Sequence, residues 1–144
     1  MYRTLKNKSR VLLIVCCVIL MAGTVSAYAA TNLMTYNGSG IRQKASVNSF
    51  TLSKSTTVTV KHNTTGVTYI GTNSPSNYTL KIYLQKKNGL QYSNTGDSFS
   101  LKGVGSKNKS WTKDKGTYRL YFQSPYPGEG KVWAGFNING KVVK

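Results

Sequence analysis

YTLKIYLQ, residues 78–85, alternates strictly between two kinds of side chain. Tyr78, Leu80, Ile82 and Leu84 fall in one register, and polar residues or a tyrosine fill the other. Successive side chains of a β-strand point to opposite faces, so this period of two predicts a strand with one buried face. The stretch therefore indicates a sheet packed against a core.

The residues around this strand extend the same pattern. Asn88-Gly89 follows it, and both residues adopt positive φ readily, which favours a tight hairpin with a return strand at 90–93. Residues 117–123 repeat the alternation, with three apolar side chains in the inward register. No amphipathic-helix period is visible after residue 30.

Strand signals recur at short intervals along the rest of the chain. They predict an all-β fold, an antiparallel β-sandwich of seven to eight strands that is jelly-roll-like or immunoglobulin-like. Residues 103–115 are expected to form a polar loop, and Asn139-Gly140 a turn before a short tail. The strands 117–123 and 131–138 are expected to pair. The expected strands are 47–53, 56–62, 67–72, 78–85, 90–93, 98–102, 117–123 and 131–138.

The first 29 residues have the layout of a secretory signal peptide. Four basic residues precede an apolar run at 11–22, and small residues follow, with a predicted cut after Ala29 and an alternative after Ala27. The run is shorter than the roughly 20 residues that span a membrane, so no stable transmembrane anchor is expected. The prediction is a secreted, extracellular protein with a flexible leader at 30–46 and a single domain at 47–144.

The cysteines bear on the source of the chain. Cys16 and Cys17 both lie in the predicted signal peptide, so the mature chain has no disulfide and no cysteine-based metal site. Secreted domains of this size from oxidising compartments usually carry disulfides. Their absence favours a bacterial exporter.

Charge is the clearest signal in the composition. The chain has 20 basic and three acidic residues, and removal of the signal peptide leaves 16 basic residues, a net charge of +13. Such a chain is attracted to polyanions. A wall phosphopolymer or an acidic polysaccharide is the expected partner, and nucleic acid and anionic lipid are alternatives. Excess lysine that merely keeps a monomer soluble is the competing explanation.

Residues suited to catalysis are few. His62 is the only histidine, no Gly-x-Ser-x-Gly motif accompanies it, and it is expected to end a strand. Asp97, Asp114 and Glu129 sit in turn-like or lysine-rich contexts and show no metal-binding spacing. The chain is therefore predicted not to be an enzyme and to need no cofactor.

Two groups of residues are candidates for ligand binding. The segment 107–115 sets four lysines around one tryptophan, and lysines bind phosphate while an exposed tryptophan can stack on a sugar or base. Alternation predicts a second, aromatic and basic face. The competing interpretations are a tryptophan that plugs the core and aromatics that only support strand pairing. The candidates are Lys81, Tyr83, Lys107, Lys109, Trp111, Lys113, Lys115, Arg119, Tyr121, Lys131 and Trp133.

The segment 116–122, GTYRLYF, followed by a glycine-rich turn and a closing strand, resembles the end of bacterial pre-peptidase C-terminal-type domains. Phe50-Thr51-Leu52 and the segment 57–60 lie where that family has its opening strands. The resemblance spans roughly residues 47–138 but lacks the acidic residues that form calcium sites in some members. It implies an accessory secreted sandwich without catalytic residues.

These observations together predict a small, cationic binding or adhesive module for anionic polymers of the cell envelope or matrix. A secreted antibacterial or toxin-like effector is the first alternative. A small extracellular hydrolase is disfavoured by the shortage of acids and histidine.

Overall fold

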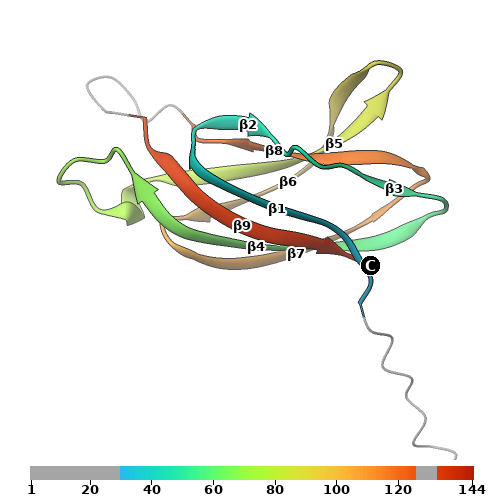
Figure 1. Cartoon of the computed structure of the whole chain (residues 1–144), viewed down its shortest axis with the longest axis horizontal. Helices are drawn as coiled ribbons and strands as arrows, with labels where there is room; N and C mark the ends of the chain where they lie inside the picture. Colours follow the sequence, from blue (N-terminus) through green and yellow to red (C-terminus); the bar gives the residue numbers. More distant parts are fainter. Residues whose placement is uncertain (1–29, 126–132) are drawn as a thin grey trace, which may run out of the picture.

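Two antiparallel sheets face each other across one core in the computed structural model, which describes residues 30–125 and 133–144 (Figure 1). The predicted all-β sandwich is confirmed. The predicted signal peptide at 1–29 lies outside the described residues, as does Lys131. The elements are β1 (Asn32–Ile41), β2 (Gln43–Ala45), β3 (Phe50–Leu52), β4 (Thr56–Thr68), the 3-10 turn η1 (Pro75–Asn77), β5 (Thr79–Asn88), β6 (Gln91–Lys102), β7 (Gly105–Lys113), β8 (Gly116–Gln123) and β9 (Gly135–Val143).

The strand order is that of a jelly roll. One sheet, called sheet A here, runs β1-β9-β4-β7, and the other, sheet B, runs β2-β8-β5-β6 with β3 also on β8. The first strand thus pairs with the last, β2 and β3 with the next to last, β4 with β7, and β5 with β6. This nesting is the double Greek key of a jelly roll.

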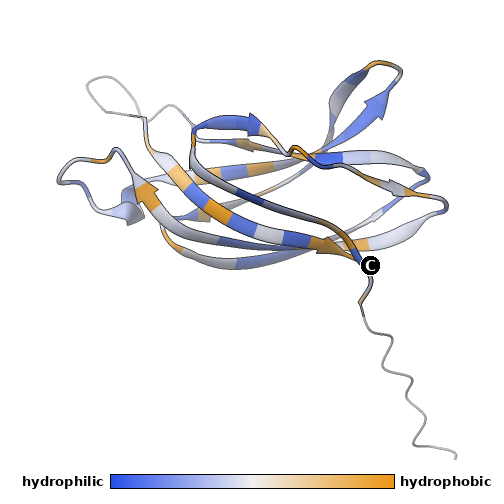
Figure 2. Cartoon of the chain, in the orientation of Figure 1, coloured by the Kyte–Doolittle hydropathy of each residue, from blue (hydrophilic) through white to orange (hydrophobic). Residues whose placement is uncertain are grey.

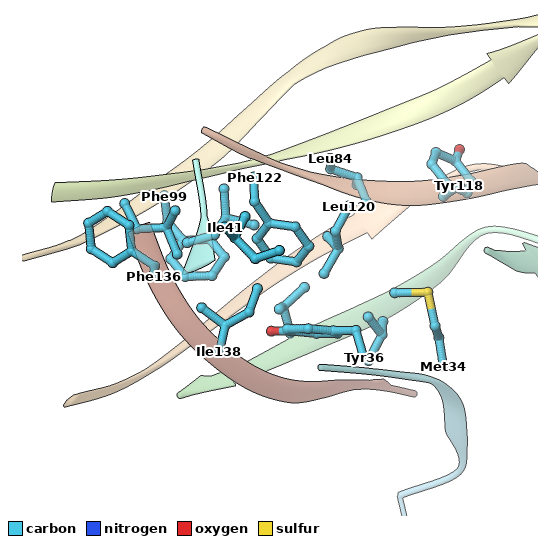
Figure 3. Close-up of a cluster of buried hydrophobic side chains, with 14 of the residues drawn as sticks. Met34, Tyr36, Ile41, Leu84, Phe99, Tyr118, Leu120, Phe122, Phe136 and Ile138 are labelled. Atoms are coloured by element: carbon cyan, nitrogen blue, oxygen red, sulfur yellow. The ribbon is translucent and has the colours of Figure 1, made fainter. Parts of the chain in front are cut away.

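The core lies between the sheets, and Figure 3 shows side chains of both sheets meeting there. Val58 and Val60 of β4 and Leu80, Ile82 and Leu120 of sheet B have no solvent exposure. Each side chain of this size stabilises the fold by roughly 1.5–3 kcal/mol when fully buried. The alternation of colour along β9 in Figure 2 is the same inward and outward pattern.

The segment 30–46, expected to be a flexible leader, instead forms β1 and β2, so this expectation is wrong. Met34, Tyr36 and Ile41 of β1 are buried in the core. β1 pairs with β9, and Thr31 and Lys144 exchange two backbone hydrogen bonds of 2.8 and 2.9 Å. Polar residues and glycines separate the few apolar residues of this segment, so the local pattern does not indicate a strand.

The expected loop at 103–115 is also corrected, because most of it forms β7, the edge strand of sheet A. Its sequence is too polar to suggest a strand, but β4 supplies a full partner ladder from Thr56 to Thr64. Inward-pointing lysines on such an edge discourage pairing with a further strand.

The expected turn at Asn139-Gly140 lies instead inside β9. Gly140 faces the core between Tyr36 of β1 and His62 of β4, which are its direct partners. A Cβ at Gly140 would clash with the Tyr36 hydroxyl and the Lys61 carbonyl oxygen. The glycine therefore makes room for two side chains to meet across β9.

Three further boundaries differ from expectation. β4 runs on to Thr68 through an irregularity between Thr64 and Gly66, so 67–72 is no separate strand. β6 is one strand where two were expected. The described part of the last strand begins at Gly135 and lies in sheet A, so it does not pair with β8. The hairpin after β5 is confirmed, with Gly89 at φ 60°.

Candidate ligand-binding surfaces

Five side chains form an aromatic-basic face on the outside of sheet B. They are Lys81 and Tyr83 of β5, Tyr92 of β6, and Arg119 and Tyr121 of β8. Tyr83 and Tyr121 are direct cross-strand partners whose ring centroids lie 6.3 Å apart at an interplanar angle of 51°. The Lys81 Nζ lies 4.9 Å from the centre of the Tyr83 ring, within cation–π range.

Arg119 is held in place by two neighbours. Its guanidinium carbon lies 4.0 Å from the centre of the Tyr92 ring. Its Nε donates a hydrogen bond of 2.8 Å to the Gln85 Oε1, and the Gln85 Nε2 donates one of 3.0 Å to the Asn94 Oδ1. These contacts order the Arg119 side chain before a ligand binds, which reduces the conformational entropy lost on binding.

The charges of this face have no carboxylate partner within residues 30–125 and 133–144. The one ion pair in that part of the chain joins Lys113 to Asp97, at the seam between β6 and β7. Lys81 and Arg119 are therefore free to meet an anionic group, with the half-buried tyrosine rings beside them.

Sequence alternation predicted part of this face correctly. It placed Lys81, Tyr83, Arg119 and Tyr121 together, and the pairing of β5 with β8 does so. Trp133 precedes β9, which belongs to the opposite sheet and does not pair with β8. The face therefore does not extend to Trp133 as predicted.

Sequence reasoning missed one member of the face, Tyr92, and the residue that holds Arg119 in place, Gln85. Tyr92 and Gln85 come from the β5–β6 hairpin, whose register shifts between Tyr83 and Gln85. An irregularity of this kind leaves no periodic signal in the sequence. The outward position of Gln85 was the one available hint.

The second predicted group, the lysines around Trp111, occupies the seam where β7 lies beside β6. The Lys107 Nζ donates a hydrogen bond of 2.9 Å to the Ser100 carbonyl oxygen, and the Lys113 Nζ pairs with the Asp97 carboxylate. Trp111 is half-buried, with its ring centroid 5.9 Å from that of Phe99, so it packs against the core. The structure thus supports the interpretation of Trp111 as a plug.

The other lysines of that segment are exposed. Lys109 lies on β7 and Lys115 just after it. Burial raises the pKa of Asp97, but hydrogen bonds from Lys113 and Thr95 and the charges of Lys113 and Lys109 outweigh it and lower the pKa below its usual value. The contacts at this seam therefore join the edges of the two sheets, and Asp97 neutralises one of its lysine charges.

His62 lies in the interior of β4, contrary to the expectation of a strand end, and is 2% exposed. Its Nδ1 lies 2.9 Å from the Tyr36 hydroxyl and its Nε2 3.0 Å from the Thr64 hydroxyl. Burial lowers the pKa of His62 to about 4 and raises that of Tyr36. The ring is thus a neutral, hydrogen-bonded part of the core.

Residues 30–125 and 133–144 show neither a metal-binding cluster nor a membrane-spanning helix. No group of three or more histidine, cysteine, aspartate or glutamate side chains there is placed to hold a metal ion. None of the helical segments there has the length and apolarity to cross a membrane.

Comparison with known proteins adds no relative. No protein-family model matches the chain, and no curated protein matches it. The resemblance to pre-peptidase C-terminal-type domains stays a prediction.

Proposed function

We propose that this protein is a secreted, monomeric and non-catalytic module that binds anionic polysaccharide through the aromatic-basic face. The observation that carries the proposal is the arrangement of Tyr83, Tyr121 and Tyr92 with Lys81 and Arg119 on one sheet surface. Tyrosine rings can stack on the apolar faces of sugar rings. The two cations beside them can pair with carboxylate, sulfate or phosphate substituents.

The position of the face supports this function. β8 and β5 lie in the middle of sheet B, and the strand backbones hold their side chains at fixed spacing. Neighbouring strands are about 4.8 Å apart, so the rings of Tyr83 and Tyr121 lie side by side on this surface, tilted by 51° to each other. A rigid platform suits a repeating polymer better than a small, enclosed ligand.

The net charge adds attraction at longer range. Attraction through charge alone weakens steeply as salt screens it, whereas contacts with the tyrosine rings do not. A specific site therefore predicts binding that falls with salt but persists at physiological ionic strength.

The test is a binding measurement with the chain from Ala30 onward, which contains every core residue of the described structure. A soluble uronic acid polymer is titrated at low salt and at 0.15 M salt. Tyr121→Ala should weaken binding about tenfold at 0.15 M salt, which corresponds to about 1.4 kcal/mol.

Tyr69→Ala is the matched control. Tyr69 is an exposed tyrosine with the Arg42 guanidinium 4.9 Å from the centre of its ring, and it lies just after β4 of sheet A, away from the aromatic-basic face. Binding that Tyr121→Ala and Tyr69→Ala leave equally unchanged, or that disappears entirely at 0.15 M salt, would contradict the proposal.

A further inference from the structure

The outer surface of sheet A carries a second, different group of polar side chains. Two parallel rows of side chains cross its four strands, and on each strand the two rows are two residues apart. We call them the lysine–amide face. The first row is Thr35, Lys141, Lys61 and Asn108, and the second is Asn37, Asn139, Asn63 and Ser106, in the order β1, β9, β4, β7.

A shallow, open depression lies between these rows. Its floor is formed by Tyr36 of β1, Gly140 of β9 and His62 of β4, the positions that lie between the two rows. The side chains of Tyr36 and His62 point to the core, so the depression is walled by the two rows alone. Residues two apart on a strand are separated by roughly 6.6 Å, so side chains of both rows can contact one phosphate group that lies over the depression.

The most informative feature is the pair Lys61 and Lys141. They are direct cross-strand partners, and both are exposed. Like charges placed directly opposite each other destabilise a sheet. Within the described part of the chain neither lysine has a carboxylate partner. The one ion pair among those residues joins Lys113 to Asp97. An anion held between the two ammonium groups would remove this repulsion.

The amides around the lysines are equally available. Among the described residues, no side-chain hydrogen bond engages Asn37, Asn108 or Asn139, and Asn63 accepts one from Ser106 with its oxygen, which leaves its NH₂ group to donate. The same sheet surface farther along behaves differently. There, the hydroxyls of Thr57 and Thr112 bond each other at 2.9 Å.

We infer that the lysine–amide face is a second binding site, which takes the phosphate groups of a polyol-phosphate polymer. Lys61 and Lys141 would pair with one phosphate, and the asparagine amides would bond to it and to neighbouring polyol hydroxyls. The two rows contain no aromatic side chain, whereas surfaces for single-stranded nucleic acid add aromatic rings on which bases stack. The chemistry therefore favours a polyol phosphate over nucleic acid.

A consequence rests on the proposed function as well. The aromatic-basic face and the lysine–amide face lie on opposite outer surfaces of the sandwich, so no single phosphate or sugar unit can contact both. A molecule with two such faces would bridge two polymer chains. The site on sheet A nevertheless stands by itself if sheet B binds nothing.

The test uses poly(glycerol phosphate), which has no sugar ring to stack on tyrosine. Calorimetric titrations at 0.15 M salt compare the chain from Ala30 onward with two double variants of equal charge. Lys61→Gln/Lys141→Gln should weaken binding at least tenfold. Lys54→Gln/Lys102→Gln removes two exposed lysines elsewhere and should weaken it less than threefold. Tyr121→Ala should have no effect on this probe, which separates the site from the proposed function.

Other results would overturn the inference. Equal losses in both double variants would mean attraction by net charge alone. Unchanged binding in Lys61→Gln/Lys141→Gln, or no binding by the unmodified chain, would exclude the site. Tighter binding of an oligothymidylate through the same two lysines would replace the polyol phosphate with nucleic acid. Backbone amide NMR spectra establish that the variants are folded, and shifts at Gly140 and Asn139 on titration should locate the site.

Discussion

Acidification should destabilise the fold through a single residue, His62. Its ring is buried, neutral and bonded to the hydroxyls of Tyr36 and Thr64. Protonation would place a charge in the core and turn both ring nitrogens into donors, so one of the two hydroxyls would lose its acceptor. The chain has no other histidine and only three acids, so few other groups titrate between pH 7.5 and 4.5.

The magnitude follows from the pKa of His62, which is about 4 in the folded protein against 6.5 in an unfolded chain. Below pH 6.5 the unfolded state binds a proton that the folded state does not, so stability falls as the pH falls, until about pH 4. Between pH 7.5 and 4.5 the free energy of unfolding should decrease by about 2.5 kcal/mol. Asp97, with its lowered pKa, loses its contribution only below this window.

Urea denaturation followed by tryptophan fluorescence at several pH values measures this loss. His62→Gln keeps a donor and an acceptor at this position without the titration, so its stability should vary by less than about 0.5 kcal/mol over the same range. Parallel losses in the two proteins would refute the reasoning. An NMR titration gives an independent check, because the imidazole of the unmodified protein should stay neutral down to about pH 4.

Three further predictions concern stability. Gly140→Ala should destabilise the fold by about 1–3 kcal/mol, because its methyl group would enter the space that the Tyr36 hydroxyl occupies, and the midpoint of urea denaturation would report it. Leu120→Ala should cost about 2–5 kcal/mol, since Leu120 has no solvent exposure, and thermal unfolding would show a correspondingly lower Tm. Asp97→Asn should cost under about 1 kcal/mol at pH 7, because its ion pair with Lys113 is partly open to solvent, and the cost should shrink in 1 M salt. A loss above 2 kcal/mol for Asp97→Asn, or none for the other two variants, would contradict these assignments.

Local sequence patterns were enough to predict the fold class and most of the aromatic-basic face. The alternation at 78–85 and 117–123 is local, because the pleat sends neighbouring side chains to opposite faces whatever the rest of the chain does. It therefore predicted the buried registers of β5 and β8, and with them the shared outer face of Tyr83 and Tyr121.

Elements that depend on a distant partner could not be predicted locally. β1 and β7 have weak patterns and form strands because β9 and β4 pair with them along most of their length. Gly140 has the local sequence of a turn, yet it lies within β9 because β1 and β4 pair with it on both sides, and the Tyr36 hydroxyl occupies the space of a side chain there.

The lysine–amide face is the clearest case of this division. Lys61 and Lys141 are 80 positions apart in the chain, and each is an ordinary outward residue of its own strand. Their direct opposition follows from the register of β4 against β9, two strands far apart in the chain that the jelly-roll order makes neighbours. Periodicity reports which way a side chain points, and the fold alone decides which other side chain it meets.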